Sequence, residues 1–429
     1  MTALLIFSCL LIGLIVSVPI FIVFAGTAFV TLGLTTSIPL SILPQRIFAG
    51  LESFTLLAIP FFFLAAQIMS RGGLSERMIN FVQTLVGHLP GGLGMTVVLT
   101  CMLFGSITGS SASTIIAVGT ILVPALVAAG YSTRFAIGSV TCSALIGMLI
   151  PPSNAMIIYG AVANVSIGAL FMSGVGAGML FTVAYCIYCV SYAQIAGIPR
   201  STRASFAQIA GAMREVVWGL GLPIVILGGI YGGIFTATEA AVVAVFYAAF
   251  VGVVIYRQID LADLWDICIE SGIASARVLV LVAAASLFSW LMTISGTTGM
   301  AAKPLLSLSD YPTLFMLSAN LISLVTGMFV DVYSNILILV PIILGPAMSA
   351  GINPTHLGIV TTVNVDIGNI TPPFGLNLFV AAAAFGQSYF TIVRAVLPWL
   401  LIAIICLLVI TFVPSISMWL PNRLYPELN

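Results

Sequence analysis

The chain has 429 residues, of which 61% are hydrophobic and 6% are charged, and its net charge is zero because 12 basic residues balance 12 acidic ones. A soluble domain normally carries about 25% charged residues, so this composition excludes a water-soluble globular protein. It also provides no basic surface for a nucleic-acid partner. Long apolar stretches recur without the alternation of polar and apolar residues that a barrel needs, which predicts an all-α polytopic protein in a lipid bilayer.

The first apolar run covers residues 4–34 and is interrupted by Pro19. It is longer than the about 20 residues that one spanning helix needs, so it is either one tilted helix or a broken pair. No basic region and no cleavage signal accompany it, and we expect it to be retained. A span follows at 53–69, and residues 71–88 are predicted to form a polar loop.

The stretch 93–129 has no charge and carries a Gly/Ser/Thr cluster in its middle. The apolar arm on each side is too short to cross a bilayer, which predicts a re-entrant hairpin that enters and leaves on one face. The next stretch, 135–162, contains Pro151-Pro152. Proline lacks an amide donor and clashes with the preceding turn, so this helix should break inside the membrane.

The second half contains a similar pair, a hairpin at 313–350 and a broken helix at 356–385 with Pro372-Pro373. Two intervening segments, 193–216 and 260–270, carry charges and are predicted to lie at the membrane interface. Further spans are expected at 167–192, 218–235, 240–256, 274–294 and 391–413.

The two hairpin and broken-helix pairs are repeats of one unit. Aligning them pairs Gly105 with Gly327 and, after one gap, Gly147 with Gly368 and the two Pro-Pro sequences with each other. Basic loops gather on one face, which the positive-inside rule makes cytoplasmic, and the two hairpins then enter from opposite faces. Inverted repeats with broken helices are typical of secondary transporters.

Each repeat is predicted to hold one sodium ion between its hairpin tip and its proline break. A broken helix frees backbone carbonyls that have no lipid partner, and hard cations prefer oxygen ligands. The candidate ligands in the first repeat are Ser106, Ser110, Ser113, Thr114, Gly147 and Pro151. Those in the second repeat are Asp331, Ser334, Asn335, Gly368 and Thr371.

The substrate is predicted to lie between the repeats, where half-helix N-termini present amide donors and partial positive charge to an anion. The candidate contacts are Ser153, Asn154, Asn377, Thr371, Pro152 and Pro373. In the alternative interpretation, the small residues only permit close helix packing. Asp331 and Asp366 are intramembrane acids, and each could be either a cation ligand or a cap for hairpin amides.

Several longer motifs extend from about residue 50 to 410. The first half contains LAIPFF at 57–62, GHLPGGLG at 87–94, SITGSSAS at 106–113 and IPPS at 150–153. The second half contains GIFTATEAA at 233–241 and DIGNITPP at 366–373. Together they resemble the large membrane subunit of TRAP transporters, the DctM-like family. The acid that this family usually has near position 113 is replaced by Ser113, which argues against a charge-based role at that tip.

The resemblance implies a multi-pass permease of the bacterial inner membrane that imports an organic acid, such as a C4-dicarboxylate or sialic acid, with two or more sodium ions. It implies two protein partners, a separate small four-helix membrane subunit and a periplasmic substrate-binding protein. It also implies an elevator, in which a transport domain (93–192 and 312–429) slides against a scaffold (1–92 and 193–311). Because neither transport stretch carries Arg or Lys beside its tip and break, we expect the substrate carboxylate to meet helix ends, hydroxyls, amides or bound sodium.

Other functions fit less well. A proton-coupled pump or antiporter subunit needs buried ionisable relays, and residues 89–130 and 135–199 carry no charge. An intramembrane protease built on Ser110 needs a nearby base, whereas His88 and His356 are predicted in loops, so we do not expect an enzyme. The closest alternative is a stand-alone sodium and organic-anion symporter of similar fold without a binding protein.

Overall fold

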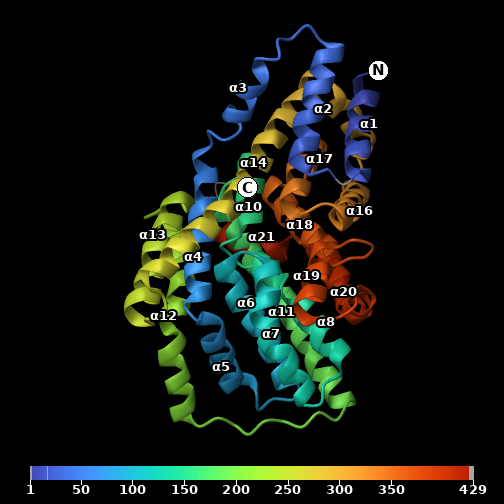
Figure 1. Cartoon of the computed structure of the whole chain (residues 1–429). Helices are drawn as coiled ribbons and strands as arrows, with labels where there is room; N and C mark the ends of the chain where they lie inside the picture. Colours follow the sequence, from blue (N-terminus) through green and yellow to red (C-terminus); the bar gives the residue numbers. More distant parts are fainter. Residues whose placement is uncertain (1, 17, 425–429) are drawn as a thin grey trace.

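The computed structural model describes residues 2–16 and 18–424, and all regular structure in this part of the chain is helical (Figure 1). Nine of the described helices are long and apolar enough to cross a membrane, or ten spans result if a bent pair is counted as one. The prediction of an all-α polytopic protein is therefore confirmed.

The N-terminal run is a broken pair of helices rather than one tilted helix. α1 (Thr2–Ile15) and α2 (Ile20–Thr35) are separated at Pro19 and pack against each other. The next elements are α3 (Ile42–Ala49), the 3-10 turn η1 (Phe54–Leu57) and α4 (Ala58–Arg71). The turn and α4 together form the second predicted span.

The polar loop predicted at 71–88 is instead largely a helix, α5 (Leu74–Val86). Its apolar residues Leu74, Met78 and Val82 recur every four positions and are buried, whereas Glu76 is exposed. The loop prediction was wrong because it weighed the charges and not this helical period.

The two segments predicted at the interface are also parts of long helices. Residues 206–216 begin α12 (Phe206–Tyr231), and residues 261–270 begin α14 (Leu261–Ile294). Each helix starts at a capping box, and no proline separates its polar start from its apolar span. The sequence analysis had separated these segments from the spans at 218–235 and 274–294, and both of these boundaries were wrong.

α13 (Ala237–Ala249) starts at a further capping box, in which the Thr236 amide donates to a Glu239 carboxylate oxygen at 2.8 Å. It continues through a wider π-helical turn, η2 (Phe250–Ile255). α13 lies against α4, and α14 lies against α2, α3 and α4. We call α1–α5 and α12–α15 the support bundle, in which α15 is Thr297–Leu306.

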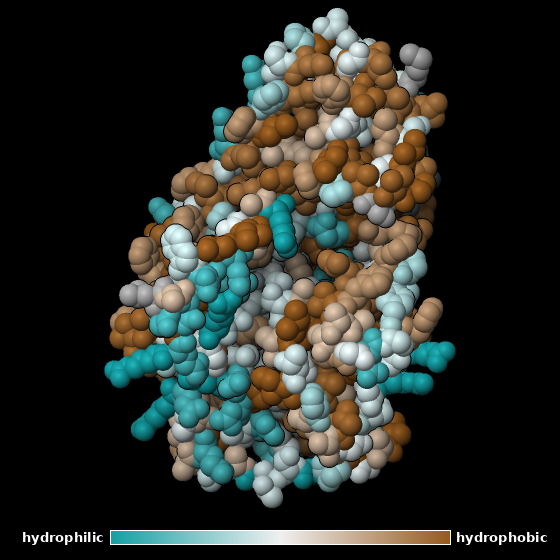
Figure 2. All heavy atoms as spheres, in the orientation of Figure 1, coloured by the Kyte–Doolittle hydropathy of each residue, from teal (hydrophilic) through white to brown (hydrophobic). Residues whose placement is uncertain are grey.

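Both predicted hairpins are present as pairs of helices, but three of their four arms have 18 residues and are long and apolar enough to cross a membrane, contrary to the short arms predicted from the sequence. The first consists of α6 (Gly92–Thr108) and α7 (Ser111–Ala128), and the second consists of α16 (Pro312–Phe329) and α17 (Val332–Ser349). In Figure 1 the hairpins lie between the end formed by α1–α3 and the opposite end, where α5 and the start of α12 lie. Hydrophobic atoms cover most of the α1–α3 end in Figure 2, and hydrophilic atoms gather near α5 and α12.

Both predicted broken helices are also present. The first is α8 (Thr133–Ser143) and α9 (Ile146–Leu149) followed by α10 (Asn154–Ala163), with a bend of 43° at the break. The second is α18 (Pro354–Gly368) followed by α19 (Leu376–Phe385). Both Pro-Pro peptide bonds are cis. The remaining helices are α11 (Ile167–Ile195), α20 (Tyr389–Phe412) and α21 (Ser415–Leu424).

The aligned glycines mark the same crossing in both repeats. A Cβ atom on Gly105 would lie 2.2 Å from the Gly147 Cα, and one on Gly368 would lie 2.6 Å from the Gly327 Cα. Only a residue without a side chain allows two backbones to approach this closely. The hairpin arm and the broken helix therefore cross in the same way in each repeat, as expected for copies of one unit.

Side-chain hydrogen bonds between distant segments fall into two sets. One set lies within α6–α11 and α16–α21, which we call the tip bundle; Tyr159 of α10, for example, donates to the Pro354 carbonyl at 2.8 Å. The other set lies within the support bundle and includes Thr238 to the Phe54 carbonyl at 3.1 Å. Among the described residues other than Tyr231, no side-chain hydrogen bond joins the bundles, although one continuous cluster of buried apolar side chains runs through both.

Candidate functional site

A cavity of about 400 Å³ lies where the two hairpin tips meet. The first residues of three helices line it, Ser111 of α7, Val332 of α17 and Leu376 of α19. Each helix start brings the positive end of its dipole to the cavity, and the Ser110 hydroxyl and the Asp331 carboxylate already accept from amides in the first turns of α7 and α17. The cavity is therefore suited to an anion. Its other lining residues are Phe63, Ser110, Ala112, Met148, Ala274, Arg277, Val278, Leu281, Asp331, Tyr333, Asn369 and Asn377.

The first tip is closed by neutral groups. Gly109 takes a left-handed conformation, with φ of 57°, and its amide donates to the Gly105 carbonyl at 2.7 Å. Ser110 caps α7, because its hydroxyl accepts from the Ser113 amide at 3.3 Å. Thr114 donates to the Ser110 carbonyl at 2.9 Å. These contacts hold the tip through backbone and hydroxyl groups alone.

The first tip rests on the first proline break. A Cβ atom on Gly109 would lie 3.2 Å from the Pro152 carbonyl oxygen. Ser153 and Asn154, which start α10, are buried, and the Ser153 hydroxyl and the Asn154 amide oxygen have no hydrogen-bond partner among the described residues. The Asn154 amide lies against the phenol of Tyr333, which comes from the second tip. The first break therefore touches both tips.

The second tip is closed by a carboxylate. One Asp331 oxygen accepts from the amides of Tyr333 and Ser334, both at 3.1 Å, and the other accepts from the Ser334 hydroxyl. Asn335 joins the two hairpin arms, because its amide oxygen accepts from the Thr326 hydroxyl at 3.0 Å. Of the two roles considered for Asp331, a cation ligand or a cap for hairpin amides, the structure shows the cap.

The second break is tied to both tips. The Gly375 amide donates to the Met328 carbonyl at 3.0 Å, which fixes the break to its own hairpin. The Asn377 side chain donates to the Ser111 hydroxyl at 2.9 Å, which fixes it to the other hairpin. The Thr371 hydroxyl donates to the Ile367 carbonyl at 2.7 Å. The helices that follow the breaks also cross over, since α10 packs on α17 and α19 packs on α7.

Asp366 differs sharply from Asp331. It is fully buried in α18, and neither carboxylate oxygen has a hydrogen-bond partner among the described residues. A buried carboxylate is costly unless a donor or a cation compensates it. Buried side-chain oxygens without a partner gather around both breaks, on Ser143, Ser153, Asn154, Asn364, Asp366 and Asn369. These are hard oxygen donors, which fit a sodium ion.

The predicted site residues divide into two groups. The structure brings Ser110, Asp331 and Asn377 to the cavity wall and places Ser153 and Asn154 just behind it. The other predicted residues serve contacts within the bundle. Ser106 donates to the Leu103 carbonyl at 2.7 Å, Gly147 and Gly368 form the glycine crossings, and Pro373 accepts from Tyr389 at 2.6 Å. Pro151 and Pro152 are buried in the first break itself.

Arg277 is a site residue that the sequence analysis missed. It lies on α14 in the support bundle and contributes to the wall of the cavity. The sequence signal was a single arginine within an apolar span predicted at 274–294. Arg277 lies outside both predicted transport stretches, and nothing in the sequence shows that α14 packs against the tips.

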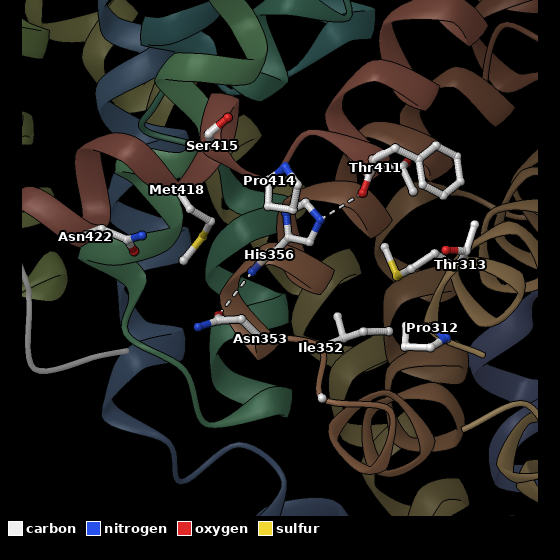
Figure 3. Close-up of a pocket in the computed structure, with 13 residues that line it drawn as sticks. Pro312, Thr313, Ile352, Asn353, His356, Thr411, Pro414, Ser415, Met418 and Asn422 are labelled. Carbon is white, nitrogen blue, oxygen red and sulfur yellow. Dashed lines mark hydrogen bonds between the residues drawn. The ribbon is translucent and has the colours of Figure 1, made fainter. Parts of the chain in front are cut away.

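A larger cavity of about 540 Å³ lies away from the tips, beside the start of α18 and the end of α20 (Figure 3). His356 lies on its wall, donates through Nε2 to the Thr411 carbonyl at 3.2 Å and places Nδ1 3.1 Å from the Ser417 hydroxyl. It is buried in the first turn of α18 and not in a loop, because Asn353 caps the helix and Pro354 starts it. Both ring nitrogens lie within hydrogen-bond distance of a protein oxygen, and none of the described residues that line this cavity is an Asp, Glu, Lys or Arg. The hairpin tips are therefore the better candidate site.

Comparison with known proteins gives one consistent result. The family described as "Tripartite ATP-independent periplasmic transporter, DctM component" matches residues 5–416. The chain is 41% identical over 379 residues to the C4-dicarboxylate TRAP transporter large permease protein DctM of Pseudomonas aeruginosa, covering 88% of this chain and 89% of the relative. It is 37% identical over 376 residues to the ectoine TRAP transporter large permease protein TeaC of Halomonas elongata, covering 88% of each.

The fold is also similar to a solved structure. The crystal structure of the YdaH transporter of Alcanivorax borkumensis, described as having an unusual topology, superposes with a TM-score of 0.64. The similarity covers 91% of this chain and 90% of that one at 18% sequence identity, so it supports the fold and not the substrate.

Proposed function

The chain belongs to the DctM family of tripartite ATP-independent periplasmic transporters, and from this we propose that it imports an organic acid together with sodium ions. Its relatives are large permease subunits and not enzymes, and the chain is accordingly a multi-pass transport protein of the bacterial inner membrane.

The observation that carries the proposal is the convergence of three helix N-termini on one cavity. Ser111, Val332 and Leu376 begin three helices at this cavity, so the positive ends of three helix dipoles surround the same space. A volume of about 400 Å³ suits a small ligand. The relatives are named for C4-dicarboxylates and for ectoine, which both carry a carboxylate. We propose a substrate of the C4-dicarboxylate size class, with sialic acid as the larger candidate to compare.

The unpartnered oxygens at the breaks support sodium coupling. In the second repeat they include both oxygens of Asp366, and we propose this carboxylate as a ligand there, because Asp331 is already occupied as a helix cap. In the first repeat the proposed ligands are the neutral oxygens of Ser143, Ser153 and Asn154. These residues would bind a cation that shields the substrate's negative charge, and two or more ions fit the two breaks.

The two hydrogen-bonded bundles support an elevator. The tip bundle would be the moving transport domain, as predicted for 93–192 and 312–429, and the support bundle would be the scaffold. Besides the central cavity, two further cavities of about 420 and 430 Å³ lie between the bundles. The boundary is interrupted by these cavities and consists mainly of apolar contacts, which can shift past one another more easily than directed hydrogen bonds.

The tripartite family implies two partners, a small membrane subunit and a periplasmic binding protein. Reconstituted together in proteoliposomes, the three components should take up succinate only when an inward sodium gradient is present. Uptake that is unchanged when potassium or choline replaces sodium would contradict the coupling. Equal uptake without the binding protein would favour the stand-alone symporter. Sialic acid and ectoine, tested beside succinate, decide the substrate class.

A further inference from the structure

Helix α14 closes the central cavity from the side of the support bundle. It contributes Ala274, Arg277, Val278 and Leu281, which follow one another at helical spacing and therefore form one face. Three of these residues are apolar and one is a cation. The tips and breaks approach this face from the other bundle, so the cavity wall is shared between the two bundles.

Arg277 is the cation on this wall, and Asp331 is the acid. The Asp331 carboxylate already accepts hydrogen bonds from the Tyr333 amide, the Ser334 amide and the Ser334 hydroxyl. In the described part of the chain, no ion pair joins Asp331 to Arg277.

Arg277 itself forms no hydrogen bond or ion pair with the described part of the chain, and its side chain is exposed. Other arginines of the support bundle are engaged. Arg46 lies 4.9 Å from the Trp290 ring centre, Arg77 lies 4.0 Å from the Tyr256 ring centre, and Arg71 pairs with Glu270. A charged residue within a spanning segment normally faces a partner or a functional cavity. Here the cavity is present and the protein partner is not.

We propose that Arg277 binds a carboxylate of the transported acid and sets the preference of the site for acids over neutral analogues. The inference rests on the proposed function, and it adds a contact from the support bundle to the helix ends of the tip bundle. A guanidinium offers two parallel donors that match a carboxylate, which a single helix end does not. An acid with two carboxylates would then meet Arg277 with one end and the helix N-termini with the other.

Because Arg277 lies on the support bundle, its contact with the substrate depends on the position of the tip bundle. The three helix ends belong to the tip bundle and would travel with the substrate, whereas Arg277 would stay with α14. Movement of the tips along α14 would therefore break the contact. Arg277 would consequently contact the substrate in the arrangement seen in this structure, and it would lose that contact once the tip bundle has moved.

The test compares Arg277→Gln and Arg277→Lys with the unmodified chain, in proteoliposomes that contain the small subunit and the binding protein. Succinate and its mono-amide, succinamate, are the probes. Arg277→Gln should raise the KM for succinate about tenfold or more and reduce the preference for succinate over succinamate. The sodium concentration for half-maximal uptake should change much less. Arg277→Lys should be intermediate, because lysine keeps the charge and loses the paired donors.

Arg214→Gln is the matched control, since Arg214 is an exposed cation on α12 of the same bundle and does not line the cavity. An unchanged KM and an unchanged acid preference in Arg277→Gln would overturn the inference and leave the proposed function intact. Absence of uptake by the unmodified complex, for succinate and for the other acids, would instead overturn the proposed function. If Arg277→Gln does not assemble with the small subunit, the acid preference of Arg277→Lys decides, and a preference equal to that of the unmodified chain counts against the inference.

Discussion

The two repeats build one cavity with the same backbone and different charges. Each has a hairpin tip on a proline break and a glycine crossing, at Gly105 with Gly147 and at Gly327 with Gly368. The first repeat closes its tip with hydroxyls, whereas the second uses a carboxylate. The shared features depend on small residues and prolines, which fix where the chain can approach or bend. The charges are free to differ, because they do not determine the backbone path.

The alignment that pairs the glycines shows at which positions the charges of the two repeats differ. Ser143 and Asn364 occupy equivalent positions, and both carry buried oxygens without a partner. Asp366, however, stands where the first repeat has Leu145. A carboxylate attracts a cation far more strongly than a neutral oxygen does in a site of low dielectric. Under the proposed sodium coupling, the second repeat should therefore bind its ion more tightly than the first.

Replacing Asp366 should have the largest effect. Asp366→Asn keeps the size of the side chain and removes its charge, and Asp366→Leu copies the residue of the first repeat. Removing one member of a buried charge pair costs several kcal/mol, so the sodium concentration for half-maximal uptake should rise about a hundredfold in Asp366→Asn. Uptake measured against a series of sodium concentrations tests this.

Ser143→Ala is the comparison variant for that experiment, because it removes a neutral unpartnered oxygen from the first repeat. It should raise the half-saturating sodium concentration by only a few-fold. Equal effects of Asp366→Asn and Ser143→Ala would show that the carboxylate does not distinguish the repeats. A sodium dependence unchanged in both would remove these residues from the ion sites.

The glycine crossings offer the next contrast. A methyl group on Gly105 would meet the Gly147 Cα at 2.2 Å, whereas one on Gly327 would meet its nearest atom, the Val365 carbonyl oxygen, at 3.1 Å. Gly105→Ala must displace backbone, which costs roughly 1–3 kcal/mol, and Gly327→Ala needs only a small adjustment. In detergent, Gly105→Ala should melt several degrees below Gly327→Ala. A smaller shift for Gly105→Ala would mean that the first crossing is looser than the structure shows.

The elements that the sequence predicts well are those with local causes. Pro151-Pro152 and Pro372-Pro373 interrupt their helices because proline lacks the amide donor that a helix needs, and the polar tips mark where each hairpin turns. α5 could also have been predicted, because Leu74, Met78 and Val82 already show its period. Helix breaks, turns and helical periods that depend on residues close together in the chain can thus largely be predicted from the sequence.

The candidate site was predicted less completely, because its chemistry depends on contacts between distant segments. The sequence left open which of Asp331 and Asp366 caps a helix, and only the position of Asp331 directly before α17 decides this. It gave no reason to place Arg277 beside the tips, since the packing of α14 determines that contact. His356 looked like a loop residue until α18 was found to start at Pro354.

The smallest effect should come from the caps of the two tips. Asp331 accepts three hydrogen bonds and Ser110 accepts one, so loss of the cap should cost more in the second hairpin. A helix cap contributes about 1 kcal/mol and up to about 2 kcal/mol. Asp331→Ala should therefore lower the melting temperature by a few degrees, and Ser110→Ala by less. If Ser110→Ala also weakens the sodium dependence while Asp331→Ala does not, Ser110 binds the ion as well as capping α7. The reverse result would return Asp331 to the ion site and make Asp366 a buried acid without that role.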